Sequence, residues 1–408
     1  MSSLNIKHIY FELKPGGGPA GYLHNLRQAV AEFGGQGSVR MQVSDEAAPP
    51  RSKRYEWVRL LRRFRVDVMP KLSRFVGTSE RVRRTRTPID WLNATFSWIG
   101  RAEASRMFAT DLLVVHSTLL AERLIRMCPE QAASKLILMT HSPTFLVHEV
   151  AVAGNPGVPE AELRDEPFVR AMVARELEVM QSARAVLWPC AEAQMGYPDW
   201  WELFQAGRVR SIYAETGTSR PVPKASSQAM RESWGIAPER KVALFIGRPH
   251  AHKGFDRFAD WADLNRKRGD SRWTFVHCGN SAGANRDLSA ITLAGYVTDN
   301  GAAYLAADLI LIPNRHSYFD LGALEAISLG GKLALSPSGG HGYLTRTCPS
   351  VPVIPDDGAE SSWDALEKIA AEYAADERRS QALVAAWQER FSLAPFYRNI
   401  ASIPDQLR

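Results

Sequence analysis

The chain has 408 residues, 45% of them hydrophobic, and a formal net charge of +6. This length suffices to bury two cores, and a single open sheet of this size would be unusual, so we expect two domains of similar size. The moderate positive charge favours an anionic partner without distinguishing a nucleotide from a lipid surface or a nucleic acid.

Composition and the first residues bear on the compartment. The four cysteines lie far apart and form no CxxC pair, which argues against a zinc site and a disulfide framework and favours a reducing compartment. The start, MSSLNIKHIYFEL, lacks the basic residues and the long apolar stretch of a signal peptide. No segment offers the roughly 18 uncharged apolar residues that span a bilayer. We therefore expect a cytoplasmic protein whose membrane contact can only be peripheral.

Short apolar runs alternate with helical patterns along the first half of the chain, which is typical of βα units that form parallel sheets. The predicted strands are residues 6–13, 112–116, 136–141, 185–189 and 209–213, and the clearest predicted helices are residues 21–33 and 169–182. These elements predict a first Rossmann-like domain over residues 1–220.

Residues 221–237 lose the apolar runs and gather Pro, Ser and Lys, as expected of a linker. A second βα series follows, with predicted strands at residues 242–247, 273–278, 309–313, 332–336 and 351–354 and a long helical tail from residue 363. We expect a second doubly wound domain over residues 221–390, and a tail, residues 391–408, that packs back on the first domain. Ligands of such sheets bind beyond the carboxyl ends of the strands, so we expect the site in a cleft between the domains.

Residues 51–87 form a basic insertion that interrupts this pattern. Its arginines and lysines far outnumber its acidic residues, and Trp57, Leu60, Leu61 and Phe64 share one helical face. Such a segment can dock on an anionic membrane surface. An ordinary domain helix with solvated arginines, or contact with an anionic polymer acceptor, explains the same pattern.

The segment IGRPHAHKGFDRF, residues 246–258, follows a predicted strand and opens a helix. Gly247 allows a sharp turn at the strand end, and Arg248 and Lys253 can both reach a diphosphate held near the helix N-terminus. Breaking a sugar–phosphate bond without a metal ion requires such cations on the departing diphosphate. Two solvated loop residues would produce the same pattern.

A second segment, NRHSYFDLGALEAISLGGKLALSPSGG at residues 314–340, makes the pattern specific. Together the two segments resemble the donor site of the retaining GT-B glycosyltransferases of glycosyltransferase family four, which includes sucrose and glycogen synthases and bacterial mannosyltransferases. The resemblance covers roughly residues 242–355 and implies an α/β fold of two doubly wound Rossmann-like domains facing a central cleft. It implies that Arg248 and Lys253 hold the diphosphate. Glu325 matches the second Glu of the family's Glu-x7-Glu motif and should accept hydrogen bonds from the ribose hydroxyls.

Ser317 stands where the first Glu of that motif would fall, so the chain departs from the family there. Phe319, Asp320 and Leu321 match the turn whose backbone amides contact the sugar hydroxyls in relatives, and Asp320 replaces a frequent glycine. Asp320 can supply the missing carboxylate, or it can cap the following helix without touching a ligand, and one residue can serve both purposes. The other alternative is that this chain recognises the donor sugar in a different way from its relatives.

Further donor contacts follow from the resemblance. Tyr296, Val297 and Thr298 are candidates for contact with the nucleobase through backbone groups. Gly17 and Gly18 belong to a glycine-rich turn, KPGGGPAGYLHNL, which lies where relatives bring the backbone near the donor phosphate.

The N-terminal domain offers one catalytic candidate. His141 ends a predicted strand and matches a histidine that in relatives faces the donor sugar. A histidine at a strand end is more often structural, and only the resemblance raises His141 above that interpretation. We place His116 and His24 in the structural group.

The sequence therefore predicts a metal-independent, retaining hexosyltransferase of polysaccharide biosynthesis, which moves a sugar from a UDP-, GDP- or ADP-sugar to a glycan or lipid-linked acceptor. No protein nucleophile is needed, because the leaving diphosphate can itself take the acceptor's proton. No metal ion or other cofactor is expected, because the cationic pair can replace a metal. A sugar-nucleotide epimerase of the same architecture is one alternative. A catalytically silent nucleotide-sugar-binding scaffold is another, and Ser317 favours it. We find no recognised nucleic-acid motif, so no nucleic-acid partner is expected.

Overall fold

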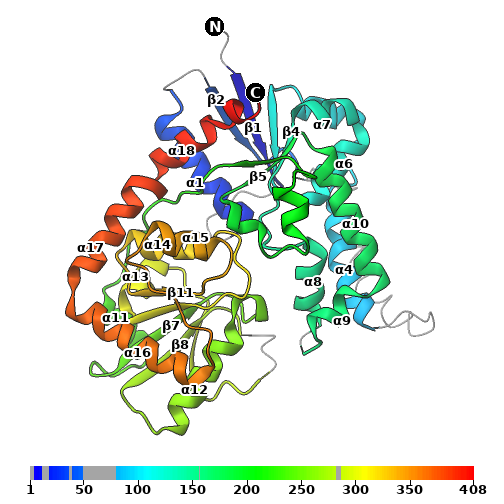
Figure 1. Cartoon of the computed structure of the whole chain (residues 1–408). Helices are drawn as coiled ribbons and strands as arrows, with labels where there is room; N and C mark the ends of the chain where they lie inside the picture. Colours follow the sequence, from blue (N-terminus) through cyan, green and yellow to red (C-terminus); the bar gives the residue numbers. More distant parts are fainter. Residues whose placement is uncertain (1–3, 12–17, 36–38, 49–79, 156, 282–285) are drawn as a thin grey trace. The chain divides into compact units, whose positions relative to one another are not determined.

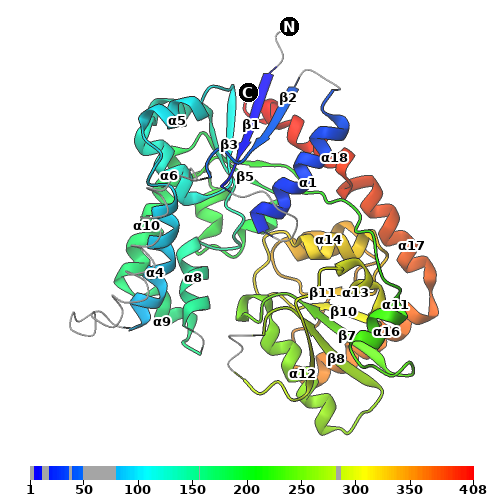
Figure 2. The ribbon, with the colours of Figure 1, turned by 180° about the vertical axis from the view of Figure 1, so that it is seen from behind.

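The computed structural model describes residues 4–11, 18–35, 39–48, 80–155, 157–281 and 286–408 (Figures 1 and 2). The chain divides into two units, which we describe separately. Unit 1 comprises Met1–Trp188, Tyr197–Tyr213 and Ala401–Arg408, and unit 2 comprises Pro189–Gly196 and Ala214–Ile400. The main division therefore falls after Tyr213, where the sequence predicted it after residue 220. Of the predicted tail, residues 391–400 group with unit 2 and only Ala401–Arg408 with unit 1.

Unit 1 is built on a parallel six-stranded sheet of order β2-β1-β3-β4-β5-β6. All residues of β3, β4 and β5 are buried, which explains why these strands are apolar runs in the sequence. The edge strand β2 was not predicted, because its apolar residues alternate with exposed polar ones. The strands are β1 (Leu4–Ile9), β2 (Val39–Ser44), β3 (Leu112–Val115), β4 (Leu136–Leu138), β5 (Ala185–Trp188) and β6 (Ser211–Tyr213).

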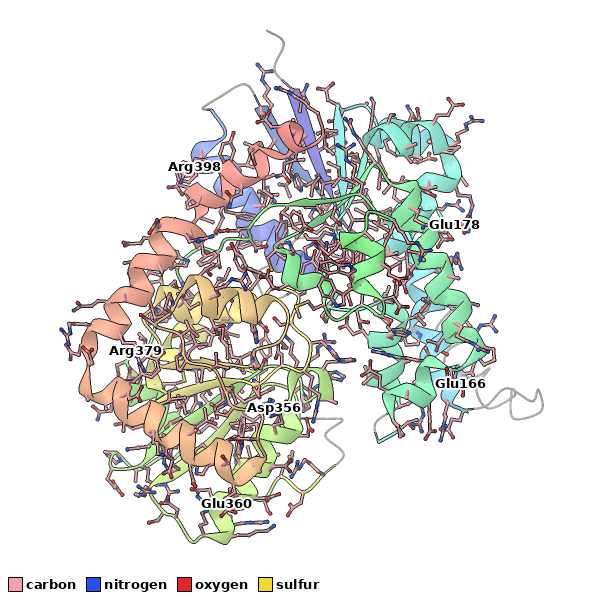
Figure 3. The ribbon with its side chains drawn as sticks, in the orientation of Figure 1. Glu166, Glu178, Asp356, Glu360, Arg379 and Arg398 are labelled. Carbon is pink, nitrogen blue, oxygen red and sulfur yellow. The ribbon has the colours of Figure 1, made fainter. Side chains whose placement is uncertain are left out.

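The helices of unit 1 connect these strands, as Figure 1 shows. A buried carboxylate, Glu176, caps the start of α8 by accepting hydrogen bonds from the backbone N–H groups of Leu146 and Val147, both at 2.9 Å. Glu178, two residues further along α10, is exposed instead (Figure 3). The helices are α1 (Gly18–Phe33), α4 (Glu80–Thr95), α5 (Arg101–Met107), α6 (Thr118–Met127), α7 (Pro129–Lys135), α8 (Leu146–Gly154), α9 (Glu160–Arg164), α10 (Pro167–Ser182), the π-helical turn Trp201–Gln205 and α19 (Ile403–Gln406).

Unit 2 is built on a second parallel sheet, of order β11-β10-β7-β8-β9. The chain leaves β7 toward β8 on one side, whereas β10 lies on the other side of β7. The carboxyl ends of β7 and β10 therefore form the switch point at which such sheets bind ligands. The strands are β7 (Lys241–Ile246), β8 (Trp273–Cys278), β9 (Ile291–Gly295), β10 (Leu309–Ile312) and β11 (Leu333–Leu335).

Two sequence predictions for unit 2 were wrong, and one strand was missed. Residues 351–354 make only an isolated bridge, between Val353 and Leu335, and no strand. The predicted linker contains a helix, α11, and β9 was not predicted because exposed residues interrupt it. The helices are α11 (Ser227–Ser233), α12 (Phe255–Lys267), α13 (Asn300–Ala306), α14 (Leu321–Ser328), α15 (Gly340–Thr347), α16 (Ala359–Ala375), α17 (Glu377–Ala386) and α18 (Leu393–Ala401), with short turns at Ala191–Gln194, Ala251–Lys253 and Trp387–Phe391.

Buried aromatic residues join α12 and α16 to the sheet of unit 2. Trp261, Trp273 and Trp363 are each only 1% exposed. The indole N–H of Trp261 donates to Ser362 at 2.9 Å, and that of Trp273 donates to Glu367 at 2.9 Å. These bonds satisfy polar atoms whose burial would otherwise oppose folding. This packing keeps the strands rigid, and the site described below lies at their ends.

The turn between β7 and α12 is packed directly against the end of β10. Gly254 has φ +66°, and a Cβ at this position would lie well inside contact distance of the Pro313 carbonyl oxygen. Gly269, at the other end of α12, has a similar φ of +65° but nothing within 4 Å of a Cβ. The two glycines share a backbone conformation and differ in the space around them.

We therefore predict different costs for two matched substitutions. Gly269→Ala should destabilise by about 1–2 kcal/mol, the cost of the left-handed conformation alone. Gly254→Ala should lower the free energy of unfolding by about 1–3 kcal/mol more than Gly269→Ala does, because the backbone at the end of β10 must move. Urea unfolding of both variants measures the difference, and equal midpoints would show that the turn can separate from β10 without cost.

Candidate functional site

The strand end of β7 leads into a tightly bent loop. Gly247 has φ +144°, and its N–H donates to the Cys278 carbonyl at 3.0 Å. The Gly247 carbonyl in turn accepts a hydrogen bond from Nε2 of the buried His277 at 2.8 Å. Arg248 follows directly and is exposed, and within the described residues its side chain has no hydrogen-bond or ion-pair partner. The loop is thus fixed through its backbone, while the guanidinium lies in solvent.

Lys253, the second predicted cation, is already paired. Its Nζ lies 2.6 Å from Oδ2 of Asp320, and the Asn314 amide donates to the same oxygen at 3.1 Å. The other oxygen, Oδ1, accepts the backbone N–H of Gly322 at 3.1 Å and so caps α14. Burial opposes ionisation of Asp320, but the Lys253 ammonium and the hydrogen bonds outweigh it and hold the pKa of this carboxyl well below its usual range.

Asp320 therefore caps a helix and binds a cation at once. The cap was one of the two roles expected from the sequence, and the ion pair with Lys253 was not foreseen. Lys253 is 42% exposed at its side chain and Asp320 only 16%. A carboxylate at the first turn of α14 also lies where the helix dipole favours negative charge.

Ser317, at the position of the missing glutamate, is 3% exposed and packs under the turn that opens α15. Its carbonyl accepts the N–H of Gly340 at 2.9 Å, and a Cβ at Gly339 would collide with the same oxygen. Within the described residues, no partner exists for three buried polar atoms nearby: Ser317 Oγ, Asn314 Oδ1 and His341 Nε2. Buried polar atoms are usually satisfied by protein, water or ligand, so their gathering here favours a polar ligand site.

Glu325 lies within α14, the helix that Asp320 caps. The Tyr304 hydroxyl of α13 donates to its Oε2 at 3.3 Å. Burial raises the pKa of Glu325 to about 7, and the nearby negative charge of Asp320 acts in the same direction. At neutral pH this side chain is therefore poised between the acid and the carboxylate.

The predicted base-contact segment follows β9. Tyr296 is 84% exposed and Thr298 is exposed, while Val297 packs against Met230 and Ala302. Phe319 and Leu321, in the predicted sugar turn, are both buried, which leaves their backbone as the part able to meet a ligand. At Phe319 and Leu321 the chain can therefore offer only backbone groups to a ligand, whereas the side chains of Tyr296 and Thr298 are open to solvent.

In unit 1, Gly18 begins α1 with φ +70°, whereas Gly17 lies outside the described residues.

His141 follows β4 and adopts φ +57°, a conformation uncommon for residues other than glycine. His141 does not stand alone: its Nε2 lies 2.7 Å from Nδ1 of His116, whose Nε2 lies 3.0 Å from Nδ1 of His8. His24 pairs with Gln28 on the same helix at 3.2 Å.

Sequence reasoning missed several residues of these clusters. Asn314 follows β10 inside the motif segment and could have been singled out as a polar residue at a strand end. Tyr304 and His341 had no such signal, because only the fold brings them to Glu325 and Ser336. His8 shares one face of β1 with Leu4 and Ile6, so nothing in the sequence distinguished it from an ordinary strand residue.

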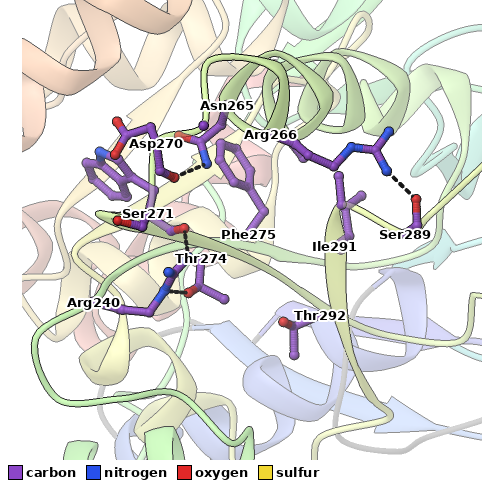
Figure 4. A pocket seen from close by; sticks show the side chains of 14 residues that line it. Arg240, Asn265, Arg266, Asp270, Ser271, Thr274, Phe275, Ser289, Ile291 and Thr292 are labelled. Carbon is purple, nitrogen blue, oxygen red and sulfur yellow. Dashed lines mark hydrogen bonds between the residues drawn. The ribbon is translucent and has the colours of Figure 1, made fainter.

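A separate cavity of about 390 Å³ lies at the opposite, amino-terminal ends of β7, β8 and β9 (Figure 4). It is lined by Arg240 and Arg266, whose side chains donate to Thr274 and Ser289. None of the predicted site residues lines it. Among the described residues, no group of three or more His, Cys, Asp or Glu side chains is placed to hold a metal ion.

The part of the chain that contains these residues resembles known proteins. Residues 240–371 match the family model described as glycosyl transferases group 1. Unit 2 therefore resembles group 1 glycosyltransferases over this range. The matched range contains Arg248, Lys253, Ser317, Asp320 and Glu325, so the cluster around α14 lies inside it.

One sequence relative matches part of the chain, and solved structures share its fold over nearly the whole length. D-inositol 3-phosphate glycosyltransferase of Corynebacterium aurimucosum is 27% identical over 177 residues, which is 40% of this chain and 42% of the relative. Sucrose-phosphate synthase from Thermosynechococcus elongatus superposes with a TM-score of 0.61 at 14% identity, over 99% of both chains. Anabaena Alr3699/HepE, in complex with UDP-glucose, gives a TM-score of 0.62 at 13% identity, over 98% of this chain and 99% of that protein.

These likenesses confirm two sequence predictions: the GT-B fold and the resemblance to family-four-like glycosyltransferases of that fold. The match to the family model ends at residue 371, before the last helices of unit 2. In the part of the chain that the structure describes, no helix is both long and apolar enough to cross a membrane.

Proposed function

We propose that this protein is a retaining glycosyltransferase, which moves a sugar from a UDP-, GDP- or ADP-sugar to a glycan or lipid-linked acceptor without a metal ion or other cofactor. One observation supports the proposal: Lys253, the first turn of α14 and Glu325 lie at the switch point of the sheet, within the range that matches group 1 glycosyltransferases, and Arg248 belongs to the loop that follows β7. The complex of Anabaena Alr3699/HepE with UDP-glucose supports a nucleotide-sugar donor.

In this mechanism the protein supplies charge and position. Arg248 and Lys253 neutralise the negative charge that develops on the departing diphosphate, and the first N–H groups of α14 add partial positive charge. The diphosphate takes the proton of the acceptor hydroxyl on the same face of the sugar, so no protein nucleophile is needed. Glu325 accepts hydrogen bonds from the ribose hydroxyls when it is ionised.

Asp320 competes with the donor for Lys253. Before the donor binds, Lys253 is neutralised by Asp320 at 2.6 Å, whereas Arg248 is exposed. The diphosphate must therefore share Lys253 with an existing carboxylate or displace it. This competition is specific to a chain that has Asp at a position where relatives frequently have glycine.

Membrane association at the cytoplasmic face, through the basic insertion, belongs to this proposal and rests on sequence alone. Residues 51–79 lie outside the described residues. In α4, which follows, Arg81, Arg84 and Arg86 pair with Glu162, Glu80 and Asp90. These three arginines are therefore engaged in ion pairs within unit 1. The role in polysaccharide biosynthesis likewise follows from the glycan or lipid-linked acceptor that we propose.

The central test is removal of each cation. Arg248→Ala and Lys253→Ala should each lower donor turnover by about 100-fold or more, because each deletes a preorganised charge on the leaving group. Arg266→Ala, which removes a half-exposed arginine at the opposite end of the sheet, should leave turnover unchanged. Transfer and donor hydrolysis are measured with the sugar nucleotide that most raises the melting temperature. Near-parent turnover in both cation variants would refute the mechanism, and tight donor binding without any turnover would favour the silent scaffold.

The pKa of Glu325 gives a second prediction. An acid with a pKa of about 7 gains negative charge as the pH rises, so sugar-nucleotide binding should tighten about tenfold between pH of roughly 6 and 8. Glu325→Gln should remove this pH dependence and weaken binding at the higher pH by roughly 1.5–3 kcal/mol. Titration calorimetry measures both effects, with Glu360→Gln on the exposed start of α16 as control. Unaltered pH dependence in Glu325→Gln would exclude the ribose role.

The competition between Asp320 and the donor for Lys253 gives a third prediction. Asp320→Asn removes the competing charge and keeps a side-chain oxygen for the helix cap, so a nucleoside diphosphate should bind about tenfold more tightly, a gain of roughly one hydrogen bond to a charged group. Asp256→Asn, which breaks the ion pair of Asp256 with Arg315 on the same sheet edge, should change the affinity little. Weaker binding of the diphosphate by Asp320→Asn would mean that Asp320 assists the donor instead of competing with it.

A further inference from the structure

Three histidines on neighbouring strands of unit 1 form a continuous hydrogen-bonded row. His8 lies on β1, His116 follows β3, and His141 lies beyond the end of β4, and these strands are adjacent in the sheet. The nitrogen–nitrogen distances are 3.0 Å from His8 to His116 and 2.7 Å from His116 to His141. His8 and His116 are fully buried, whereas His141 is partly exposed. The row therefore runs from the core to the carboxyl edge of the sheet.

All three rings are neutral at physiological pH. Burial lowers the pKa of His8 and of His141 to about 3 and the pKa of His116 well below its usual value. A neutral imidazole has one nitrogen that donates a hydrogen bond and one that accepts. Since both nitrogens of His116 are engaged in the row, the direction of one bond determines the direction of the other.

Only two arrangements of the hydrogens are possible. In the first, Nδ1 of His8 donates to Nε2 of His116, and Nδ1 of His116 donates to Nε2 of His141. In the second, every hydrogen bond is reversed, and Nε2 of His8 carries a hydrogen. That atom is buried and has no partner within the described residues. Buried donors without a partner are rarer than under-satisfied acceptors, so the first arrangement is favoured.

The surroundings hold the rings in place. The Tyr22 ring, 2% exposed, packs against His116 and His141 with centroid distances of 5.2 and 5.0 Å. The backbone of His141 adopts φ +57°, a conformation that persists only where the surrounding structure imposes it. Such constraints are typical of residues whose orientation serves a function, and less so of a residue that merely fills the core.

We propose that His8 and His116 are positioning residues that fix His141 in the tautomer with its hydrogen on Nδ1. In this state His141 is a hydrogen-bond donor at Nδ1, and its Nε2 lone pair is occupied by His116, so it does not act as a base. This role rests on the proposed function, in which the leaving diphosphate takes the proton, and on the family resemblance, which implies that His141 faces the donor sugar. The tautomer itself is a property of the free protein.

The nitrogen chemical shifts of isotope-labelled histidine, recorded on the full chain without donor, test the proposal. We expect His8, His116 and His141 to carry hydrogen on Nδ1 and a bare Nε2, while His24 averages both tautomers. His116→Phe should release His141 into such averaging and lower donor turnover about tenfold, the equivalent of one hydrogen bond. His24→Gln is the matched control and should change neither signal nor turnover.

The outcomes separate the two proposals. A parent protein whose His141 carries its hydrogen on Nε2, or averages like His24, would overturn the inference even if His116→Phe does not fold. A His116→Phe variant that folds and keeps the Nδ1 tautomer of His141 would overturn it as well. A locked tautomer in a protein without any donor turnover would support the inference and refute the proposed function.

Discussion

The ion pair between Lys253 and Asp320 ties together the parts of unit 2 that meet at the switch point of the sheet. Lys253 belongs to the turn after β7, and Asp320 begins α14 after β10. A largely buried carboxylate would be costly without a partner, so the pair and the Asn314 amide keep the turn and the helix in one arrangement. One carboxylate serves both purposes: its Oδ2 binds the cation and the amide, and its Oδ1 caps the N-terminus of α14.

Close backbone packing surrounds this pair and explains why glycine recurs there. Gly254 lies against the Pro313 carbonyl, and Gly339 and Gly340 lie against the backbone of Ser317 and Tyr318. These approaches leave no room for a Cβ at the glycine positions. They hold the loops after β10 and β11 together, so the polar atoms of Ser317, Asn314 and His341 are buried by the fold itself.

The two units stabilise their buried polar groups in different ways. Unit 2 keeps a charged pair and a carboxyl group, Glu325, whose pKa burial raises to about 7. Unit 1 keeps His8, His116 and His141 neutral and connects them to one another, so that each ring supplies a partner for the next. Charge suits a site for an anionic ligand, and a neutral row with a defined direction suits the orientation of a hydrogen-bond donor.

The sequence by itself determined the fold class and the location of the cations, because both depend on local pattern. Buried parallel strands are apolar runs, and the turn after β7 carries Arg248 and Lys253 within a few residues of the strand end. The cap at Asp320 could be foreseen for the same reason, since a cap involves residues two apart. Edge strands such as β2 and β9 were missed because exposed residues interrupt their apolar runs.

Only the tertiary structure decided which groups touch. Lys253 and Asp320 are 67 residues apart, and His8 and His116 are 108 apart. Their pairing depends on the order of strands in each sheet, which local periodicity does not encode. The pKa values of Glu325 and of the three histidines follow from burial, and burial is set by what the rest of the chain packs against them. The chemistry of a residue type is written in the sequence, whereas its charge state and its partner are consequences of long-range packing.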